Sequence, residues 1–207
     1  MIPAADAPGT DLGKPLGPTF RLLMVGSSIF EQWVNPAVAF PNCSVVNAAI
    51  GGTQTDDWLD RLPDALNQHR PDVLALYCGS NDLARGQSPE TVIGNTRRLR
   101  ELLTGYDAAA PMLYFNVIQC PAKLDYWDQV QRVNAAVREL LHPGDTVVDP
   151  NAVFVDHQLD PPQNTPCVFQ DDGVHLTAKG YHLLSAHVRG ELMRHRWFGL
   201  DSARRSP

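Results

Sequence analysis

Five short apolar runs, separated by segments of helical periodicity, constrain the fold of this 207-residue chain more than any other feature. The runs lie at residues 22–25, 45–47, 73–78, 112–117 and 146–149. Runs of this length and composition are typical of strands buried on both faces. Their alternation with helical segments predicts an α/β fold, a three-layer α/β/α sandwich around a five-stranded parallel sheet.

The segments between these runs carry signals for the starts and ends of helices. Thr55 is expected to cap one helix, and Ser88 with Pro89 to open a second that Gly105 closes. Two more helices are expected to begin at Asp125 and Thr177. Each segment has apolar residues at helical spacing, as expected of amphipathic crossover helices. The proline-containing stretch 152–170 is longer than a routine connection and is predicted to be irregular and to border a site.

Length and charge limit the domain organisation and the partners. The length fits one domain, predicted over residues 20–200, and the first 19 residues, rich in Pro, Gly and Asp, are predicted to form a loose arm. The net charge is −6 and the basic residues are scattered. A chain of this kind lacks the positive field that nucleic acid requires, so a small molecule is the expected partner.

The sequence shows no sign of secretion, membrane insertion or a metal site. Its N-terminus lacks the basic and apolar regions of a signal peptide, and no apolar run is long enough to span a bilayer, so a cytoplasmic location is expected. No histidine pair has the spacing of a zinc site. The cysteines are far apart and are expected to be reduced, mostly as small core residues; they are Cys43, Cys78, Cys120 and Cys167.

The first predicted strand ends in Gly26-Ser27-Ser28, which places serine hydroxyls at a strand-to-helix turn. Free backbone N–H groups and the positive end of a helix lie at such a turn, so Ser28 is a candidate nucleophile. The competing interpretation is that Ser27 or Ser28 only caps the helix, and for an isolated motif this short, capping is the commoner role. The second glycine of the Gly-x-Ser-x-Gly elbow is absent.

The ends of the second and third predicted strands carry further polar groups. Paired glycines, Gly51 and Gly52, allow close backbone approach and an inward-facing N–H that could bind an oxyanion, or they form a simple turn. Asn81 could direct an amide donor to the same point, or it could form a local turn with Asp82. The carboxyl ends of strands are where open α/β sheets bind ligands, so these groups are expected to lie together.

Asp172 and His175 stand three residues apart just before the last predicted helix. At this spacing the carboxylate can accept the Nδ1–H of the imidazole and leave Nε2 to take a proton from serine. A lone histidine is usually structural, and the six other histidines are interpreted as surface or packing residues. Asp172 and His175 are therefore candidates for an orienting carboxylate and a general base.

These four blocks, in this order, resemble those of the SGNH hydrolases, also called the GDSL esterase/lipase family. The matching segments are Gly26-Ser27-Ser28, residues 47–52, residues 79–82 and residues 172–175. The resemblance implies a flavodoxin-like fold, the catalytic residues Ser28, Asp172 and His175, and an oxyanion hole formed by the N–H groups of Ser28 and Gly52 with the side chain of Asn81. Ser27 stands where the family usually has Asp, a position outside the triad.

The resemblance implies a serine esterase that forms an acyl-enzyme and requires no cofactor and no metal. Short-chain carboxylic esters are the expected substrates, since the chain has no long apolar segment that could form a lid. Acetylated carbohydrates, lysophospholipids and thioesters are alternatives within the family. A non-catalytic flavodoxin-like binding module is the alternative of a different class. The sequence carries no signal for the oligomeric state.

Overall fold

A computed structural model describes residues 20–158 and 168–194 of the chain. Within these ranges five parallel strands form one sheet in the order β2-β1-β3-β4-β5. The strands are β1 (Phe20–Gly26), β2 (Cys43–Asn47), β3 (Val73–Tyr77), β4 (Met112–Phe115) and β5 (Thr146–Val148). Each coincides with a predicted apolar run, and the predicted α/β sandwich is confirmed. The predicted N-terminal arm lies outside the described residues, and the single domain over 20–200 stays a prediction.

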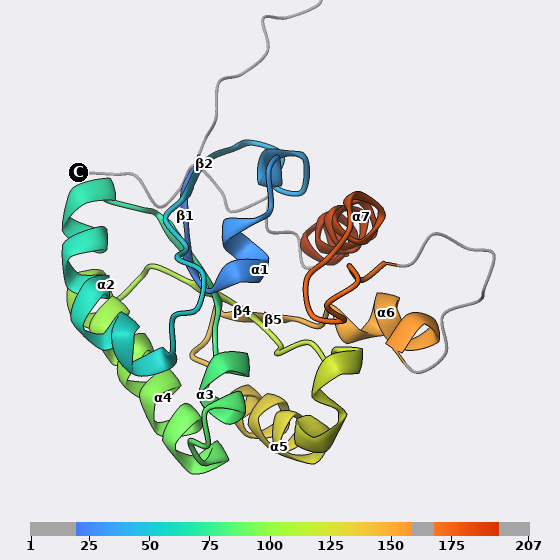
Figure 1. Cartoon of the computed structure of the whole chain (residues 1–207). Helices are drawn as coiled ribbons and strands as arrows, with labels where there is room; N and C mark the ends of the chain where they lie inside the picture. The colour runs from blue at the N-terminus through green and yellow to red at the C-terminus, as the bar shows by residue number, and fades with distance from the viewer. Residues whose placement is uncertain (1–19, 159–167, 195–207) are drawn as a thin grey trace, which may run out of the picture.

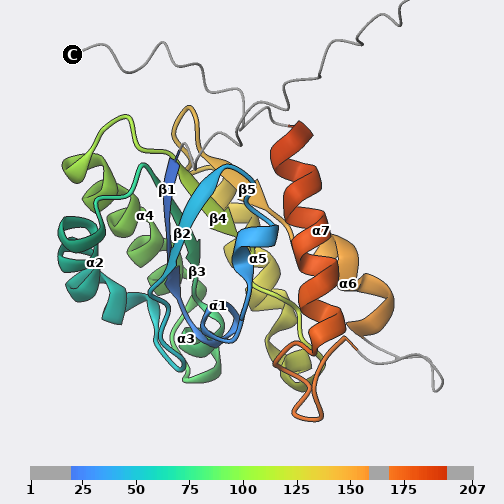
Figure 2. The same cartoon turned by 90° about the horizontal axis from the view of Figure 1, so that it is seen from above.

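Helices and short 3₁₀ segments connect the strands. The helices are α1 (Ser28–Glu31), α2 (Thr55–His69), α3 (Ser80–Ala84), α4 (Pro89–Tyr106), α5 (Trp127–Arg138), α6 (Asn151–Gln158) and α7 (Ala178–Arg194), and the 3₁₀ segments are η1 (Pro36–Val38) and η2 (Pro121–Tyr126). Helices α2, α4 and α5 cover one face of the sheet, and α1, α6 and α7 lie on the other (Figure 1). The view from above shows the same three layers (Figure 2).

Each face of the sheet has its own apolar core, because alternate strand residues point to opposite sides. Leu22 and Met24 of β1 belong to the core beneath α1 and α7, whereas Leu23 and Val25 belong to the core beneath α2, α4 and α5. All four side chains are at most 2% exposed. Burial on both faces explains why β1, β3 and β4 read as continuous apolar runs in the sequence, whereas β2, at the edge of the sheet, is largely exposed.

The helix starts agree with the sequence in two cases and differ in two. The Ser88 hydroxyl accepts the N–H of Thr91, and Thr177 Oγ1 accepts the N–H of Gly180, as expected of caps. Thr55, by contrast, is the first helical residue of α2, and Gln54 is its cap. The expected start at Asp125 was wrong because 3₁₀ segment η2 begins at Pro121 and occupies that position. The other end of α4 also differs, since the helix continues past Gly105 to Tyr106.

The prediction of an irregular stretch over 152–170 was wrong at its start, where α6 extends to Gln158. Phe154 of this helix is fully buried, and its ring lies 5.7 Å from that of Phe169, itself 3% exposed. Both rings belong to the core beneath α7. They are therefore core residues. Residues 159–167 of the predicted stretch lie outside the described residues.

Three of the four cysteines lie within the described residues. Cys78 and Cys120 are buried and Cys43 is half-buried, all three as free thiols; Cys167 lies outside the described ranges. Burial raises the pKa of the Cys43 thiol to about 11. Among the helices that the structure describes, none is both long and apolar enough to cross a membrane.

One buried ion pair ties α4 to the turn before β5. Arg100 Nε lies 2.8 Å from Asp145 Oδ2, with side-chain exposures of 4% and 0%, and the same carboxylate accepts the N–H groups of Met112 and His142. Removing one partner of such a pair leaves a buried charge uncompensated. We expect Asp145→Ala to lower the free energy of unfolding by about 3–5 kcal/mol, measured by urea denaturation.

The matched control for Asp145→Ala is an exposed pair of the same charge type. Arg132 and Glu90 form an ion pair with side-chain exposures of 65% and 63%. Glu90→Ala should therefore change the free energy of unfolding far less than Asp145→Ala does. Equal losses in the two variants would show that burial does not determine the contribution of the Asp145 pair.

Candidate functional site

The turn after β1 depends on Gly26, the last residue of that strand. Gly26 has φ +132°, and a Cβ atom there would collide with the carbonyl oxygen of Tyr77 in β3. The next residue, Ser27, donates its N–H to that same oxygen over 3.0 Å. The close approach of β1 and β3 thus fixes the backbone at the sheet edge, and Ser28 follows as the first residue of α1.

Ser28, His175 and Asp172 form one chain of hydrogen bonds. Ser28 Oγ lies 2.9 Å from His175 Nε2, and His175 Nδ1 lies 2.5 Å from Asp172 Oδ2. The Ser28 side chain is partly exposed, so a substrate could reach it. Ser27, although it is the N-cap of α1, makes no side-chain capping bond. The structure therefore brings together the three residues that the sequence singled out for a serine, a base and its orienting carboxylate.

The carboxylate of Asp172 is held by the backbone of its own turn as well as by the imidazole. Asp172 Oδ1 accepts the N–H groups of Val174 and His175, each over 2.9 Å. The hydrogen bond from His175 and these two backbone bonds lower the pKa of Asp172 to about 2. Asp172 is therefore ionised at neutral pH and can keep the imidazole in one orientation.

Contacts with three other parts of the fold position the turn that carries His175. The His175 carbonyl accepts the N–H of Gln170 over 2.7 Å, and the carbonyl of Gly173, which has φ +65°, accepts the N–H of Ala122 over 3.1 Å. The Tyr181 hydroxyl of α7 donates to the Ile29 carbonyl of α1 over 2.8 Å. This last bond joins the helix that follows His175 to the helix that begins at Ser28.

The glycine loop after β2 is anchored to the end of β1. The Gly26 carbonyl accepts both the N–H of Ile50, over 2.9 Å, and the hydroxyl of Thr53, over 3.0 Å. Gly52, between them, has φ +78°, a conformation that favours glycine. In the part of the chain that the structure describes, the N–H groups of Ser28 and Gly52 have no acceptor. Two backbone donors are thus available beside Ser28.

Asn81 lies at the start of α3, directly after β3, and is bonded to the glycine loop. Its Nδ2 donates to the Thr53 carbonyl over 3.0 Å. A primary amide has two N–H bonds, so a second donor remains on the same nitrogen. The structure therefore links Ser28, Gly52 and Asn81 through the adjacent ends of β1, β2 and β3, as the sequence predicted.

Asp82 has a structural role that the sequence did not reveal. Its carboxylate is fully buried, and Oδ1 accepts the N–H of Thr55 over 2.9 Å and the Thr55 hydroxyl over 2.5 Å. Burial raises the pKa of Asp82 in spite of these bonds. Thr55 is the first residue of α2 and directly follows the glycine loop, which ends at Thr53 and Gln54. Since Asp82 belongs to α3, its bonds to Thr55 hold the end of the glycine loop against α3. The local turn considered for Asn81 and Asp82 does not explain these long-range bonds.

Two cations lie next to these residues, and neither could be recognised from the sequence. Lys123 Nζ donates to the hydroxyl of Ser80 over 2.8 Å and to its carbonyl over 3.2 Å. Arg85 Nη1 donates to Gln54 Oε1 over 2.8 Å. Burial lowers the pKa of Lys123, and the Arg85 charge lowers it further. Lys123, within η2, and Arg85, directly after α3, have no recognisable spacing in the sequence, so only the structure shows that they lie near the site.

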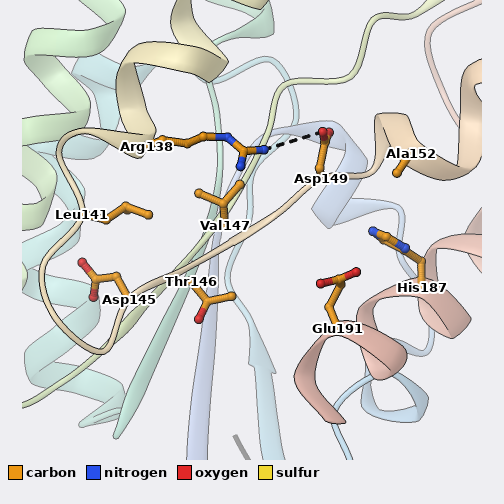
Figure 3. Close-up of a pocket in the computed structure, with 9 residues that line it drawn as sticks. All are labelled: Arg138, Leu141, Asp145, Thr146, Val147, Asp149, Ala152, His187 and Glu191. Atoms are coloured by element: carbon orange, nitrogen blue, oxygen red, sulfur yellow. Dashed lines mark ion pairs between the residues drawn. The ribbon is translucent and has the colours of Figure 1, made fainter. Parts of the chain in front are cut away.

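A separate cavity of about 440 Å³ lies at β5, the edge strand of the sheet, and Ser28 is not among the residues that line it (Figure 3). It is lined by Arg138, Leu141, Asp145, Thr146, Val147, Asp149, Ala152, His187 and Glu191. Arg138 and Asp149 form an ion pair of 3.9 Å across it. None of the site residues predicted from the sequence lines this cavity, so it is not the candidate site. Among the described residues, no cluster of three or more His, Cys, Asp or Glu could hold a metal ion.

Comparisons with known proteins agree with this geometry. The sequence model of the GDSL-like Lipase/Acylhydrolase family matches residues 26–183. An arylesterase from Vibrio mimicus is 27% identical over 152 residues, which cover 73% of this chain and 71% of that protein. Thioesterase 1/protease 1/lysophospholipase L1 from Escherichia coli is 32% identical over 111 residues, 49% of this chain and 52% of that protein, so this match spans about half of the relative.

Solved structures are similar in fold. A member of the lipolytic protein G-D-S-L family from Veillonella parvula superposes with a TM-score of 0.71, covering 84% of this chain and 98% of that one. Its sequence is 19% identical to this chain. At this identity the similarity shows the fold alone.

Proposed function

This chain belongs to the GDSL-like lipase/acylhydrolase family, and we propose that it hydrolyses short-chain carboxylic esters through an acyl-enzyme on Ser28. Family membership makes the chain an ester hydrolase rather than a non-catalytic binding module. The hydrogen-bonded chain from Ser28 through His175 to Asp172 carries the finer proposal, because it is the arrangement that nucleophilic catalysis by serine requires.

In the proposed mechanism, the Oγ of Ser28 attacks the ester carbonyl carbon while His175 Nε2 takes the hydroxyl proton. The imidazolium then protonates the departing alcohol, and an acyl-serine ester remains. His175 next takes a proton from water, whose oxygen attacks the acyl carbonyl, and Oγ leaves with that proton as the carboxylic acid departs. Ionised Asp172 orients the imidazole and stabilises its positive charge throughout.

The N–H groups of Ser28 and Gly52 and the second N–H of Asn81 are proposed to bind the oxyanion of the tetrahedral intermediate. Supporting this, the two backbone donors have no acceptor among the described residues, and Asn81 is bonded to the loop that carries Gly52. Donors held in place before reaction stabilise developing charge without reorganisation.

Asn81→Ala should lower kcat by about 10²–10³-fold, the usual loss for one oxyanion donor. Steady-state kinetics with p-nitrophenyl butyrate would measure this, and circular dichroism would verify the fold. Asn67→Ala, at an exposed position near the end of α2, is the matched control and should leave kcat unchanged. An unchanged kcat in folded Asn81→Ala would reduce Asn81 to a residue that only anchors Thr53.

The short-chain preference is proposed from the apolar surface near the site. Ile50 and Leu124, next to the glycine loop and to Lys123, are 40% and 51% exposed. Two such side chains can cover a few methylenes, each contributing about 0.8 kcal/mol while buried. We expect kcat/KM for p-nitrophenyl esters to rise from acetate over a few carbons and then level off or fall. A maximum at palmitate, or a rise in rate when an emulsion forms, would instead indicate a lipase groove.

Thioester hydrolysis is a second candidate, favoured by the 32% identity to a protein named as a thioesterase. The proposed acyl-serine chemistry would be the same for a thioester, since only the leaving group differs. Comparing kcat/KM for acyl-CoA thioesters, p-nitrophenyl esters and acetylated sugars on one protein preparation ranks these candidates directly.

A further inference from the structure

Lys123 and Arg85 lie close to two of the residues proposed to bind the oxyanion. The ammonium of Lys123 is bonded to Ser80, the residue before Asn81. The guanidinium of Arg85 approaches Gly52, because its Nη2 would lie 3.7 Å from a Cβ atom at that glycine. The segment that carries Lys123 also contacts the turn that carries His175, since the N–H of Ala122, next to Lys123, donates to the Gly173 carbonyl. Lys123 thus lies on a segment bonded to the His175 turn, and Arg85 lies beside Gly52.

Neither cation forms an ion pair within the ranges that the structure describes. By contrast, Arg100 and Arg132 each have a carboxylate partner. The charge of the Asp82 carboxylate acts on Lys123, but Asp82 Oδ1 is bonded to Thr55, and Oδ2 has no hydrogen-bond partner among the described residues. A chain of net charge −6 therefore places two cations without carboxylate partners at its proposed site.

Both cations keep hydrogen-bond donors for a ligand. The bonds to Ser80 use two of the three N–H bonds of the Lys123 ammonium. The bond to Gln54 uses Nη1 of Arg85, so Nη2 has no acceptor in the described part of the chain. A guanidinium binds carboxylate and phosphate with paired N–H donors, and an ammonium adds a point charge.

We propose that the substrate is an ester with an anionic group, a carboxylate or a phosphate, a few bonds from the scissile carbonyl, and that Lys123 and Arg85 bind this group. The inference rests on the proposed hydrolysis at Ser28 and adds the substrate class. It changes no bond-making step. A carboxylate of the opposite charge, that of Glu31, lies against Gly51 and would repel an anion placed beside that glycine. The anion is therefore directed toward Lys123 and Arg85.

The test compares anionic and neutral esters of matched shape. In the first arm of the test, anionic 4-acetoxybenzoate is compared with its neutral methyl ester, so that the charge lies in the alcohol part. In the second arm, anionic mono-4-nitrophenyl adipate is compared with neutral 4-nitrophenyl hexanoate, so that the charge lies in the acyl part. In a third arm, 4-acetoxyphenyl phosphate replaces the carboxylate by a phosphate. Rates are corrected for spontaneous hydrolysis. For at least one arm we expect kcat/KM to favour the anionic ester by about tenfold at low salt, with the preference falling as ionic strength rises.

Variants separate charge recognition from a purely structural role. Lys123→Met and Arg85→Gln should each lower the anionic-to-neutral ratio of kcat/KM by up to about fivefold, whereas Lys123→Arg should retain it. Arg98→Gln, an exposed cation in the third turn of α4, is the matched control and should leave the ratio unchanged. A structural role alone would lower kcat/KM equally for both members of a pair and leave the ratio constant.

Two outcomes distinguish this inference from the proposed function. If the neutral esters are hydrolysed and the wild-type ratio is one or less in every arm, the anionic substrate class is wrong and the esterase proposal stands. If no ester of either kind is hydrolysed, the proposed function itself fails.

Discussion

Ser28→Ala is expected to lower kcat for p-nitrophenyl butyrate by about 10⁴–10⁶-fold, the range seen when one member of a serine triad is removed. The variant lacks the Oγ that lies 2.9 Å from His175 Nε2, so no acyl-enzyme can form. Stability should change little, because Ser28 is only partly buried. Steady-state kinetics, with urea denaturation to verify the fold, provide the measurement.

Ser27→Ala is the matched control for this variant. Ser27 is adjacent to Ser28 and is 3% exposed, and its side chain makes no capping bond to α1. Its kcat should stay within about tenfold of the wild-type value, because no proposed step uses its hydroxyl. Full activity in Ser28→Ala would assign the nucleophile to another residue.

His175→Ala is expected to lower kcat by about 10⁵–10⁶-fold, and Asp172→Ala by about 10⁴-fold. His175 transfers the proton, whereas Asp172 only orients the imidazole and stabilises its charge. The side chain of Asp172 is 46% exposed, so water can replace part of its interaction after truncation. A larger loss in Asp172→Ala than in His175→Ala would contradict these roles.

The lowered pKa of Asp172 determines how this carboxylate contributes to the pH dependence of stability and activity. The pKa of Asp172 is lowered to about 2 in the folded protein, so its ionised form contributes to stability above about pH 4. That contribution is lost only as the pH falls toward 2. An acid limb in the pH dependence of kcat/KM above about pH 4 would therefore not report the protonation of Asp172. Loss of activity on adding a chelator would contradict the metal-free mechanism.

The strands β1, β3 and β4 could be predicted from the sequence because nearly all of their residues are buried, whereas the largely exposed edge strand β2 was predicted from a short apolar run alone. Five apolar runs each became a strand, and the edge where β1, β2 and β3 end carries Ser28, Gly52 and Asn81. Strand ends in a parallel sheet meet at one edge, so the order of the runs was enough to predict which polar groups would meet. Asp172 and His175 depended on local spacing, which a tight turn converts into a hydrogen bond.

Features that depend on loop paths could not be predicted. The stretch 152–170 was expected to be irregular, yet α6 occupies its start and places Phe154 in the core. The positions of Lys123 and Arg85 follow from η2 and the end of α3, and no pattern in the sequence specifies how those segments approach each other. The anchoring of Thr55 by Asp82 likewise joins residues 27 positions apart.

The most direct test of the central claim is to locate the covalent adduct of a fluorophosphonate probe by mass spectrometry of the digested protein. Such a probe reacts with a serine activated by an adjacent base. The account predicts one adduct, on Ser28, and none in His175→Ala under the same conditions. An adduct on Ser27 or on a serine distant from His175, with Ser28 unmodified, would contradict it.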